Sequence, residues 1–295
     1  MRVNPNPIPS LLSALQQTEQ QINNDMAEIA SGQSVSQPSD NPSAAALLVQ
    51  NADQTSEADQ FLRSIGSVQG EMQNADSTLN SVITVLQRAI TLGTEGANGT
   101  LNQSDREAIA AEVQGIQSQL LSLANLTYQG NFVFAGTATQ TAAYVLDNTS
   151  SSGVRYTGNA GTNNITLGNG FSVQTNVPGS QLFSAAGNDM FQAIQDLITN
   201  LQSGTNIGTA VTEVSNAYNY VNAQRVFYGN AVNQLNAQQN FLNSETTQLA
   251  QQQSNLGGAD LSKVISDLVN AQTSRQATLE SIAQNQQTNL FSYLK

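Results

Sequence analysis

The residues best able to do chemistry in this sequence are three carboxylates close together in the chain, Asp105, Glu107 and Glu112. Paired carboxylates can act as general acid and base when the pKa of one of them is raised. However, Ser104 and Glu107 have the spacing of a capping box, in which each side chain satisfies a free backbone N–H at a helix start. Acidic residues in a first turn are also stabilised by the positive end of the helix. We therefore interpret these carboxylates as helix-start residues.

Other reaction centres lack their usual side chains. The sequence contains no Cys and no His, which excludes thiol chemistry, His-based triads and the usual structural zinc sites. It also lacks a phosphate-binding loop, a dinucleotide fingerprint and an EF-hand loop. The sequence predicts no catalytic, cofactor-binding or metal-binding residue and no cofactor, and hence a protein that is not an enzyme.

Four aromatic residues, Tyr218, Tyr220, Phe227 and Tyr228, lie close together in a segment with helical spacing. Such a cluster can form a ligand site. Aromatic side chains also bury a large apolar area, so they frequently pack between helices. We favour inter-helix packing, and a ligand site is the alternative.

Two residues of the same segment, Arg225 and Gly229, are unusual for a long helix. Arg225 falls in a column of otherwise core-type positions, where a charge is costly unless it is paired. We expect it to set the register of the helix or to meet an acid on a neighbour. Gly229 costs about 1 kcal/mol relative to Ala in a helix interior, and we expect it to allow another backbone to approach.

The elements that carry these residues are long helices. From Ile207 to Leu256 every seventh residue is large and apolar, which predicts a helix of roughly 75 Å with a partner helix alongside. A second ladder follows a turn and extends from about Ser43 to Leu92, where Gly93 and Gly96 are expected to end the helix. The side chains predicted to pack in this helical rod are Ile65, Met72, Leu79, Leu86, Val214, Val221, Tyr228, Leu235, Leu242 and Leu249.

The chain ends carry weaker amphipathic patterns. We predict helices there that pair and form contacts between subunits, and we expect both ends to be poorly ordered in a free monomer. The candidate interface residues are Leu12, Leu15, Ile22, Met26, Ile29, Ile265, Leu268, Leu279, Ile282, Leu290, Phe291 and Leu294. A turn, Pro38-Ser39-Asp40-Asn41-Pro42, follows the first helix, with Asn41 as a cap and Pro42 in the first helical position.

The pattern changes after Gly130, where Gly, Asn, Thr and Val become frequent and short apolar runs alternate with turns. Runs at 154–156, 165–167 and 171–177 predict strands; a disordered linker is the alternative. The fold class is therefore mainly α, an elongated coiled-coil-like rod with a small inserted β-rich domain. The expected domains are terminal polymerisation segments (1–42 and 258–295), a helical rod (43–137 and 186–257) and the insert (138–185).

Composition restricts the possible partners. Only 10% of the 295 residues are charged, the net charge is −12, and nine residues are basic. Nucleic-acid binding needs clustered Lys and Arg, so we expect none. We also expect no membrane insertion and no cleaved signal peptide, because no stretch approaches the ~20 apolar residues of a span and the N-terminus has no apolar core.

Several motifs occur in the order found in one known family. They are Ser31-Gly32-Gln33 with Val35 and the proline turn, 97–101 with Asp105-Arg106, Leu123-Ala124-Asn125, 130–137, Pro178-Gly179 with Phe183, Arg225 with 229–235, and 289–294. On these motifs nearly the whole chain resembles the flagellin superfamily, and within it the members that join hook to filament. Gln33 and Asn41 replace the usual Lys and second Asp, and the proline-rich start also departs from the pattern.

The resemblance implies a structural subunit of the bacterial flagellum. Its terminal helices would pair in an inner tube, and its subunits would form a junction ring. This ring would connect the hook, through the first hook-associated protein, to flagellin. The resemblance further implies an extracellular location, reached by flagellar type III export with a cytosolic chaperone. The alternatives are a minor flagellin of the filament itself and a secreted coiled-coil adhesin or effector.

Overall fold

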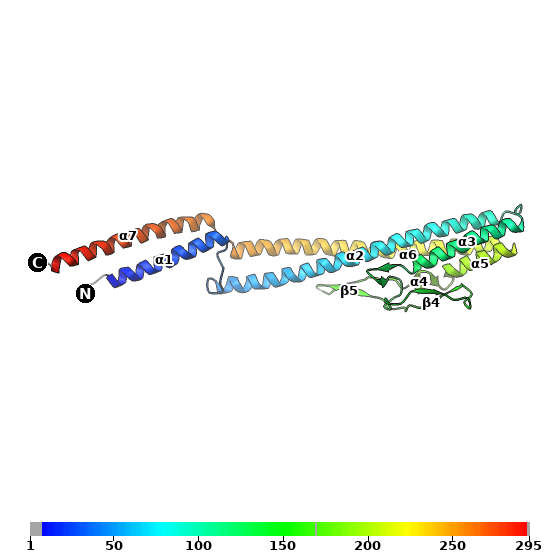
Figure 1. Cartoon of the computed structure of the whole chain (residues 1–295), viewed down its shortest axis with the longest axis horizontal. Coiled ribbons are helices and arrows are strands. Elements are labelled where there is room, and N and C mark those ends of the chain that lie inside the picture. Colours follow the sequence, from blue (N-terminus) through cyan, green and yellow to red (C-terminus); the bar gives the residue numbers. More distant parts are fainter. Residues whose placement is uncertain (1–7, 169, 294–295) are drawn as a thin grey trace. The chain divides into compact units, whose positions relative to one another are not determined.

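The computed structural model describes residues 8–168 and 170–293, and of residues 286–293 it describes only the backbone. Most of these residues are helical (Figure 1). The helices are α1 (Ile8–Ser31), α2 (Pro42–Gly96), α3 (Gln103–Ala124), α4 (Gly179–Leu182), α5 (Met190–Ser203), α6 (Ile207–Gly257) and α7 (Leu261–Tyr293). The prediction of a mainly α fold with a strand-containing insert is confirmed.

Eight short strands form four antiparallel hairpins between α3 and α5. They are β1 (Thr127–Tyr128) with β2 (Asn131–Phe132), β3 (Tyr144–Leu146) with β4 (Val154–Tyr156), β5 (Asn164–Leu167) with β6 (Phe171–Gln174), and β7 (Ser184–Ala185) with β8 (Asn188–Asp189). The strands predicted at 154–156, 165–167 and 171–177 are present, the last of them ending at Gln174. The alternative of a disordered linker is wrong.

The chain divides into two compact units. Unit 1 contains residues 1–57 and 244–295, and unit 2 contains residues 58–243. The helices α2 and α6 contribute residues to both units, and all the strands lie in unit 2. The predicted limits at residues 42, 137, 185 and 257 differ from this division, and the three separate domains stay a prediction.

The core of unit 2 follows the two seven-residue ladders. Ile65, Leu79, Val214 and Leu235 have no exposed surface, and the core continues into the insert through Phe134 and other aromatic rings. Of the two glycines predicted to end α2, Gly96 is its last residue and Gly93 lies within its last turn. A Cβ on Gly93 would lie 2.6 Å from Val211 Cγ2. At Gly96 it would overlap the side chain of Leu201. The helix ends where predicted to within four residues, and both glycines also permit close helix packing.

The start of α3 also differs from the predicted capping box. The Asn102 side chain accepts from the backbone N–H of Asp105 at 2.9 Å, and Asp105 accepts from the N–H of Asn102 at 3.3 Å. The box predicted at Ser104 and Glu107 is therefore wrong by two residues. The helix starts earlier, and the Gln103 side chain donates to the carbonyl of Gln202 at the end of α5. This contact ties the start of α3 to another helix.

Unit 1 contains α1 and α7 as an antiparallel pair, together with the first turns of α2 and the last turns of α6. Its buried apolar side chains are few: Ile22, Ala44, Leu249, Val264 and Ala271. At the start of α2, the Asn41 side chain accepts from the backbone N–H of Ala44 at 3.1 Å, as expected of a cap. Unit 1 is therefore held by a much smaller apolar core than unit 2.

Candidate functional site

The carboxylates considered for catalysis are each used in structure. Asp105 caps α3, Glu107 accepts from the side chain of Gln103 at 3.1 Å, and Glu112 pairs with Arg88 at 2.6 Å. Across residues 8–168 and 170–293 no group of acidic side chains has the arrangement of a metal site. Within the same ranges no helix combines the length and apolarity that a membrane span requires.

The aromatic cluster of α6 is divided among several contacts. Tyr228 is 1% exposed and lies edge-on to Phe227, with ring centroids 5.2 Å apart. The Tyr220 hydroxyl donates to the carbonyl of Gln181 in α4 at 2.9 Å. Tyr218 accepts from the side chain of Gln87 in α2 at 3.1 Å. These side chains make contacts within α6 and with α2 and α4, as expected of inter-helix packing.

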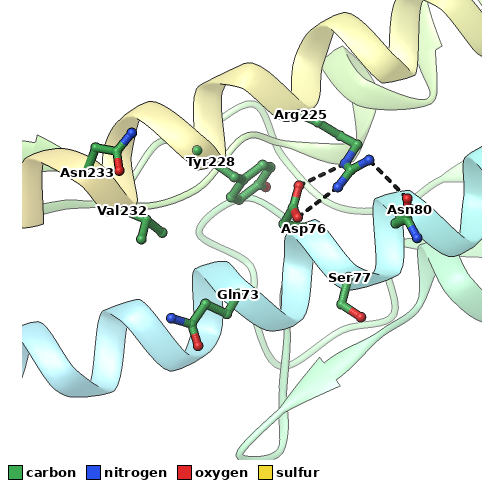
Figure 2. A pocket seen from close by; sticks show the side chains of 9 residues that line it. Gln73, Asp76, Ser77, Asn80, Arg225, Tyr228, Val232 and Asn233 are labelled. Atoms are coloured by element: carbon green, nitrogen blue, oxygen red, sulfur yellow. Dashed lines mark hydrogen bonds and ion pairs between the residues drawn. The ribbon is translucent and has the colours of Figure 1, made fainter. Parts of the chain in front are cut away.

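Arg225 meets an acid on the neighbouring helix of its own chain (Figure 2). Its Nε and Nη2 donate to the two carboxylate oxygens of Asp76 at 2.8 and 2.9 Å. Its Nη1 donates to the Asn80 side chain at 3.0 Å. The hydrogen bonds with Asp76 raise the pKa of Arg225. A bidentate pair of this kind fixes geometry as well as charge. Asp76 could not be predicted as the partner, because nothing in the sequence shows which α2 residue lies opposite Arg225.

The Arg225–Asp76 pair lies between two other polar bridges that join α2 and α6. The Gln69 side chain donates to Asn236 at 2.9 Å, and Gln87 donates to Tyr218. Gln69 and Asn80 of α2 are as many residues apart as their α6 partners, Asn236 and Arg225. The partners follow in the reverse order, as an antiparallel register requires. Changing the register by one residue would separate all three bridges. We therefore propose that they define the register of α2 against α6.

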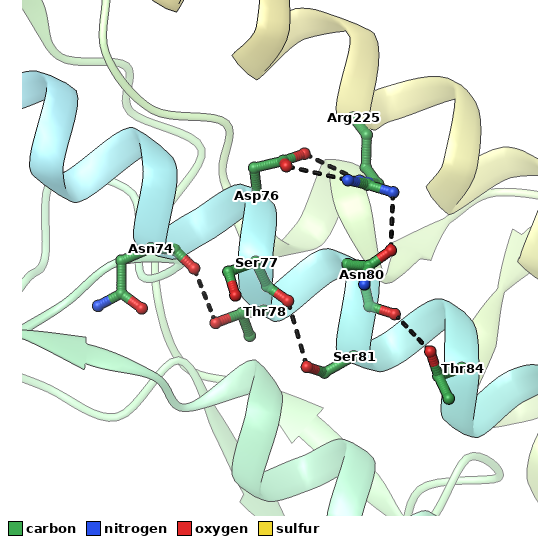
Figure 3. A network of polar contacts seen from close by, with 8 residues as sticks. All are labelled: Asn74, Asp76, Ser77, Thr78, Asn80, Ser81, Thr84 and Arg225. Carbon is green, nitrogen blue, oxygen red and sulfur yellow. Dashed lines mark hydrogen bonds and ion pairs between the residues drawn. The ribbon is translucent and has the colours of Figure 1, made fainter.

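The α2 side of this region carries further polar contacts along the helix (Figure 3). The hydroxyls of Thr78, Ser81 and Thr84 donate to the carbonyls four residues earlier, at 2.9, 3.2 and 3.0 Å. These bonds satisfy the hydroxyls without a partner from another helix. Arg225 is therefore bound by Asp76 and Asn80, while the hydroxyls around them remain within α2.

Gly229 lines an open hollow of about 540 Å³ beside the Arg225–Asp76 pair. Gln73 and Asn233 also line it, and Figure 2 shows them on opposite helices. No atom lies within 4 Å of the position a Cβ would occupy on Gly229. The expectation that Gly229 permits another backbone to approach is therefore not met within this chain.

A double-mutant cycle on Arg225 and Asp76 tests the register proposal. Both side chains are partly exposed, at 28% and 39%, so solvent weakens the pair. We expect Arg225→Leu and Asp76→Leu each to lower the free energy of unfolding, with a coupling energy of about 1 kcal/mol.

The Arg88–Glu112 pair is the matched control for this cycle. Its side chains are 55% and 50% exposed, so we expect a coupling energy below about 0.5 kcal/mol. Urea unfolding followed by circular dichroism measures both cycles. Equal coupling energies for the two pairs would show that Arg225 contributes no more than a surface ion pair.

All ten side chains predicted to pack in the rod are buried. Their exposed fractions range from 0% to 6%: Ile65, Met72, Leu79, Leu86, Val214, Val221, Tyr228, Leu235 and Leu242 lie in unit 2, and Leu249 lies in unit 1.

The predicted interface residues at the chain ends occupy three kinds of environment. Ile22 is buried, whereas Leu12, Met26, Ile265 and Leu279 are 43–51% exposed. The others whose side chains are described are half-buried: Leu15, Ile29, Leu268 and Ile282. Leu290 and Phe291 lie where only the backbone of α7 is described, and Leu294 lies outside the described residues.

The apolar side chains of α7 lie on more than one face of the helix. The buried ones are Val264 and Ala271, whereas the interface candidates Ile265 and Leu279 are exposed, as is Leu261. Val269, which is 55% exposed, was missed although its four-residue spacing from Ile265 could have identified it.

Unit 1 carries most of the exposed apolar surface that the structure describes. Of the eleven large apolar side chains that are exposed, eight belong to unit 1. These eight are Leu12, Met26, Leu47, Val49, Leu261, Ile265, Val269 and Leu279. We interpret these exposed apolar residues as candidates for contact with another molecule. We call these eight residues the outer apolar set.

The described residues therefore form a mainly helical protein in which α1 pairs with α7 and many polar side chains are used in packing and capping. Two models of one family match the sequence: the bacterial flagellin N-terminal helical region at residues 6–139, and the bacterial flagellin C-terminal helical region at residues 205–294. The chain belongs to the bacterial flagellin family.

Individual relatives fall into two groups. Flagellar hook-associated protein 3 of Escherichia coli is 33% identical over 137 residues, 44% of this chain and 43% of that protein. A flagellin of Listeria monocytogenes is 29% identical over 174 residues, 52% of this chain and 57% of that protein. Neither match therefore spans two thirds of the relative.

A solved structure has a similar fold over a larger share of the chain. A protein from Vibrio parahaemolyticus, described as flagellar hook-associated, matches with a TM-score of 0.68 at 21% identity. The match covers 74% of this chain and all of that chain. At this identity the likeness establishes the fold.

Proposed function

We propose that this protein is a structural component of the bacterial flagellum, forming the junction ring between the hook and the flagellin filament. The E. coli relative, named flagellar hook-associated protein 3, supports the junction role. Membership of the flagellin family at both chain ends supports a flagellar role more generally. The protein acts by binding and spanning, not by catalysis.

The observation that carries the proposal is the outer apolar set on unit 1. Side chains such as Ile265 and Val269 lie half-exposed on a helix whose own partner, α1, covers a different face. Burying them against neighbouring subunits would stabilise a ring by about 25 cal/mol for each Å² of apolar surface. A chain with only 10% charged residues meets little local repulsion when copies pack together.

The proposed partners follow from this position in the flagellum. The subunits contact one another in a ring. The ring contacts the first hook-associated protein on one side and flagellin on the other. Export occurs through the flagellar type III apparatus with a cytosolic chaperone, and the ring is extracellular. The exposed α1–α7 surface would need protection from premature association, which is the role of such a chaperone.

Immunogold electron microscopy on intact cells tests the proposal. We expect a single band of label where the hook meets the filament. Label along the whole filament would instead identify a minor flagellin, which the similarity to the Listeria flagellin makes the second candidate. Label away from flagella would leave a secreted coiled-coil adhesin or effector.

A further inference from the structure

The turn between α2 and α3 carries an Asn-Gly pair on its surface. Asn98 and Gly99 lie just beyond Gly96, the last residue of α2, and both are exposed. The backbone around the pair is held in place, because the Asn98 N–H donates to the Glu95 carbonyl at 3.0 Å and the Leu101 N–H donates to the Asn98 carbonyl at 3.1 Å. The pair is therefore presented to solvent in a defined turn.

The side-chain amide of Asn98 is held through its oxygen alone. Oδ1 accepts from the backbone N–H of Thr100 at 3.2 Å and from the Thr100 hydroxyl at 3.0 Å. Across the described residues, Nδ2 makes no hydrogen bond. Donors on a carbonyl oxygen stabilise the negative charge that collects there when the carbonyl carbon is attacked. Cγ of Asn98 is thus activated, and its amine is free to leave.

The backbone nitrogen of Gly99 is the group placed to attack this carbon. None of the residues that the structure describes accepts from its N–H. Glycine also has no Cβ to obstruct the approach of the nitrogen to Cγ of Asn98. Because the two atoms belong to neighbouring residues, closing a five-membered ring between them costs little entropy.

We propose that Asn98 is a site of spontaneous deamidation in the folded protein. The Gly99 nitrogen loses its proton to water and bonds to Cγ of Asn98, and the Cγ–Nδ2 bond breaks with release of ammonia. Water then opens the resulting succinimide at either carbonyl and gives aspartate or isoaspartate. One water is consumed and one ammonia is released, without an oxidant or a reductant. This inference concerns the chemistry of the chain and does not depend on the junction role.

Both products change the turn between α2 and α3. Each adds a negative charge just beyond the carboxyl end of α2, where the helix dipole disfavours an anion. Isoaspartate also directs the backbone through the former side chain and lengthens the turn by one atom. The turn leads directly into Asn102, which caps α3. We therefore expect modified chains to unfold at a lower urea concentration than unmodified chains.

Asn159 is an internal control with a similar turn. It is exposed, and its Oδ1 accepts from the N–H two residues later, on Gly161, at 3.0 Å and from the N–H of Thr137 at 2.8 Å. The next residue, however, is Ala160, and Nδ2 of Asn159 donates to the Thr137 hydroxyl oxygen at 2.8 Å. A methyl group beside the attacking nitrogen and a bonded amine should both slow the reaction.

Incubation of the full-length chain at neutral pH, followed by peptide mapping with mass spectrometry, tests the proposal. In the folded chain we expect Asn98 to deamidate at least about tenfold faster than Asn159. We also expect its rate to lie within about tenfold of the rate in chain unfolded by urea, with isoaspartate among the products. The other Asn-Gly pair of the sequence, at 169–170, is followed separately in the same maps.

Gly99→Ala is the blocking variant. The φ of Gly99 is not positive, and no atom lies within 4 Å of the position that a Cβ would occupy, so the turn should keep its structure. We expect deamidation of Asn98 to slow at least about tenfold. The proposal is overturned if Asn98 stays intact in the folded chain while it reacts in urea, if Asn98 and Asn159 react equally fast, or if Gly99→Ala leaves the rate unchanged.

The contribution of the Thr100 hydroxyl is tested separately. Thr100→Val keeps the shape of the side chain and removes the donor to Oδ1, so the rate should fall about threefold. Thr100→Ser keeps the donor and should retain the rate. Equal rates for these two variants would overturn the role assigned to the hydroxyl.

Discussion

Replacing Tyr228 by Ala is expected to lower the free energy of unfolding by about 3–5 kcal/mol, as for other buried aromatic residues. Tyr228 is 1% exposed, belongs to the apolar ladder of α6 and packs edge-on against Phe227. Truncation removes the ring and leaves a cavity that the long helices cannot close, because their spacing is fixed by neighbouring ladder residues such as Val221 and Leu235. Urea unfolding followed by circular dichroism measures the loss.

The matched control is Tyr228→Phe, which keeps the ring and removes the hydroxyl. That hydroxyl has no hydrogen-bond partner in the described structure. Burial raises the pKa of Tyr228; the backbone of Val177 is near enough to oppose this effect in part, but it does not have hydrogen-bonding geometry with the hydroxyl. Removing an unsatisfied buried polar group is neutral or stabilising, so we expect no loss of stability. A loss comparable to that of the Ala variant would mean that the hydroxyl is bonded in solution and is essential.

Replacing Ile265 by Glu is expected to prevent self-association without unfolding the subunit. Ile265 is 51% exposed, so the free energy of unfolding should change by no more than about 0.5 kcal/mol. In an assembly the same position would become buried, and an unpaired carboxylate there costs far more than the lost apolar contact. We expect the concentration needed for assembly to rise at least about tenfold, since each 1.4 kcal/mol gives a factor of ten.

Light scattering against protein concentration and swimming assays of cells carrying the variant measure this effect. Gln272→Glu adds the same charge to the exposed surface of α7 and serves as the control, with near-normal assembly expected. Ile265→Val keeps an apolar surface and should retain assembly. If Ile265→Glu and Gln272→Glu have equal effects, the outer apolar set is not the contact surface and net charge explains the result.

The repeats of seven residues made the long helices and their buried ladders predictable. Leu79 and Val214 could be assigned to a packed face because such a repeat places its apolar residues on one side of a helix regardless of what lies opposite. The strand at 154–156 was also predictable, because turn residues border a short segment in which Val154 and Tyr156 alternate with a polar residue. The candidate site was only partly predictable: Arg225 was noticed as a charge in a core column, but its partner Asp76 was not.

The departures arose where a neighbouring segment decides the local structure. Glycine favours the end of a helix, yet Gly93 lies within the last turn of α2, where Val211 packs in the space that a side chain would need. On α7 the sequence offers apolar residues on more than one face, and Val264 is buried whereas Ile265 is exposed. Local sequence contains no information about which of two nearly equivalent apolar faces a distant helix will cover.

The helical class, the two ladders, the strand-rich insert and the absence of Cys and His could be read from the sequence, because they depend on residue type and spacing along one segment. The Arg225–Asp76 pairing, the antiparallel bridge between Gln33 and Gly258, and the buried face of α7 became known only from the folded chain. These features join residues more than a hundred positions apart, and their energies depend on distances that exist only once the helices have packed.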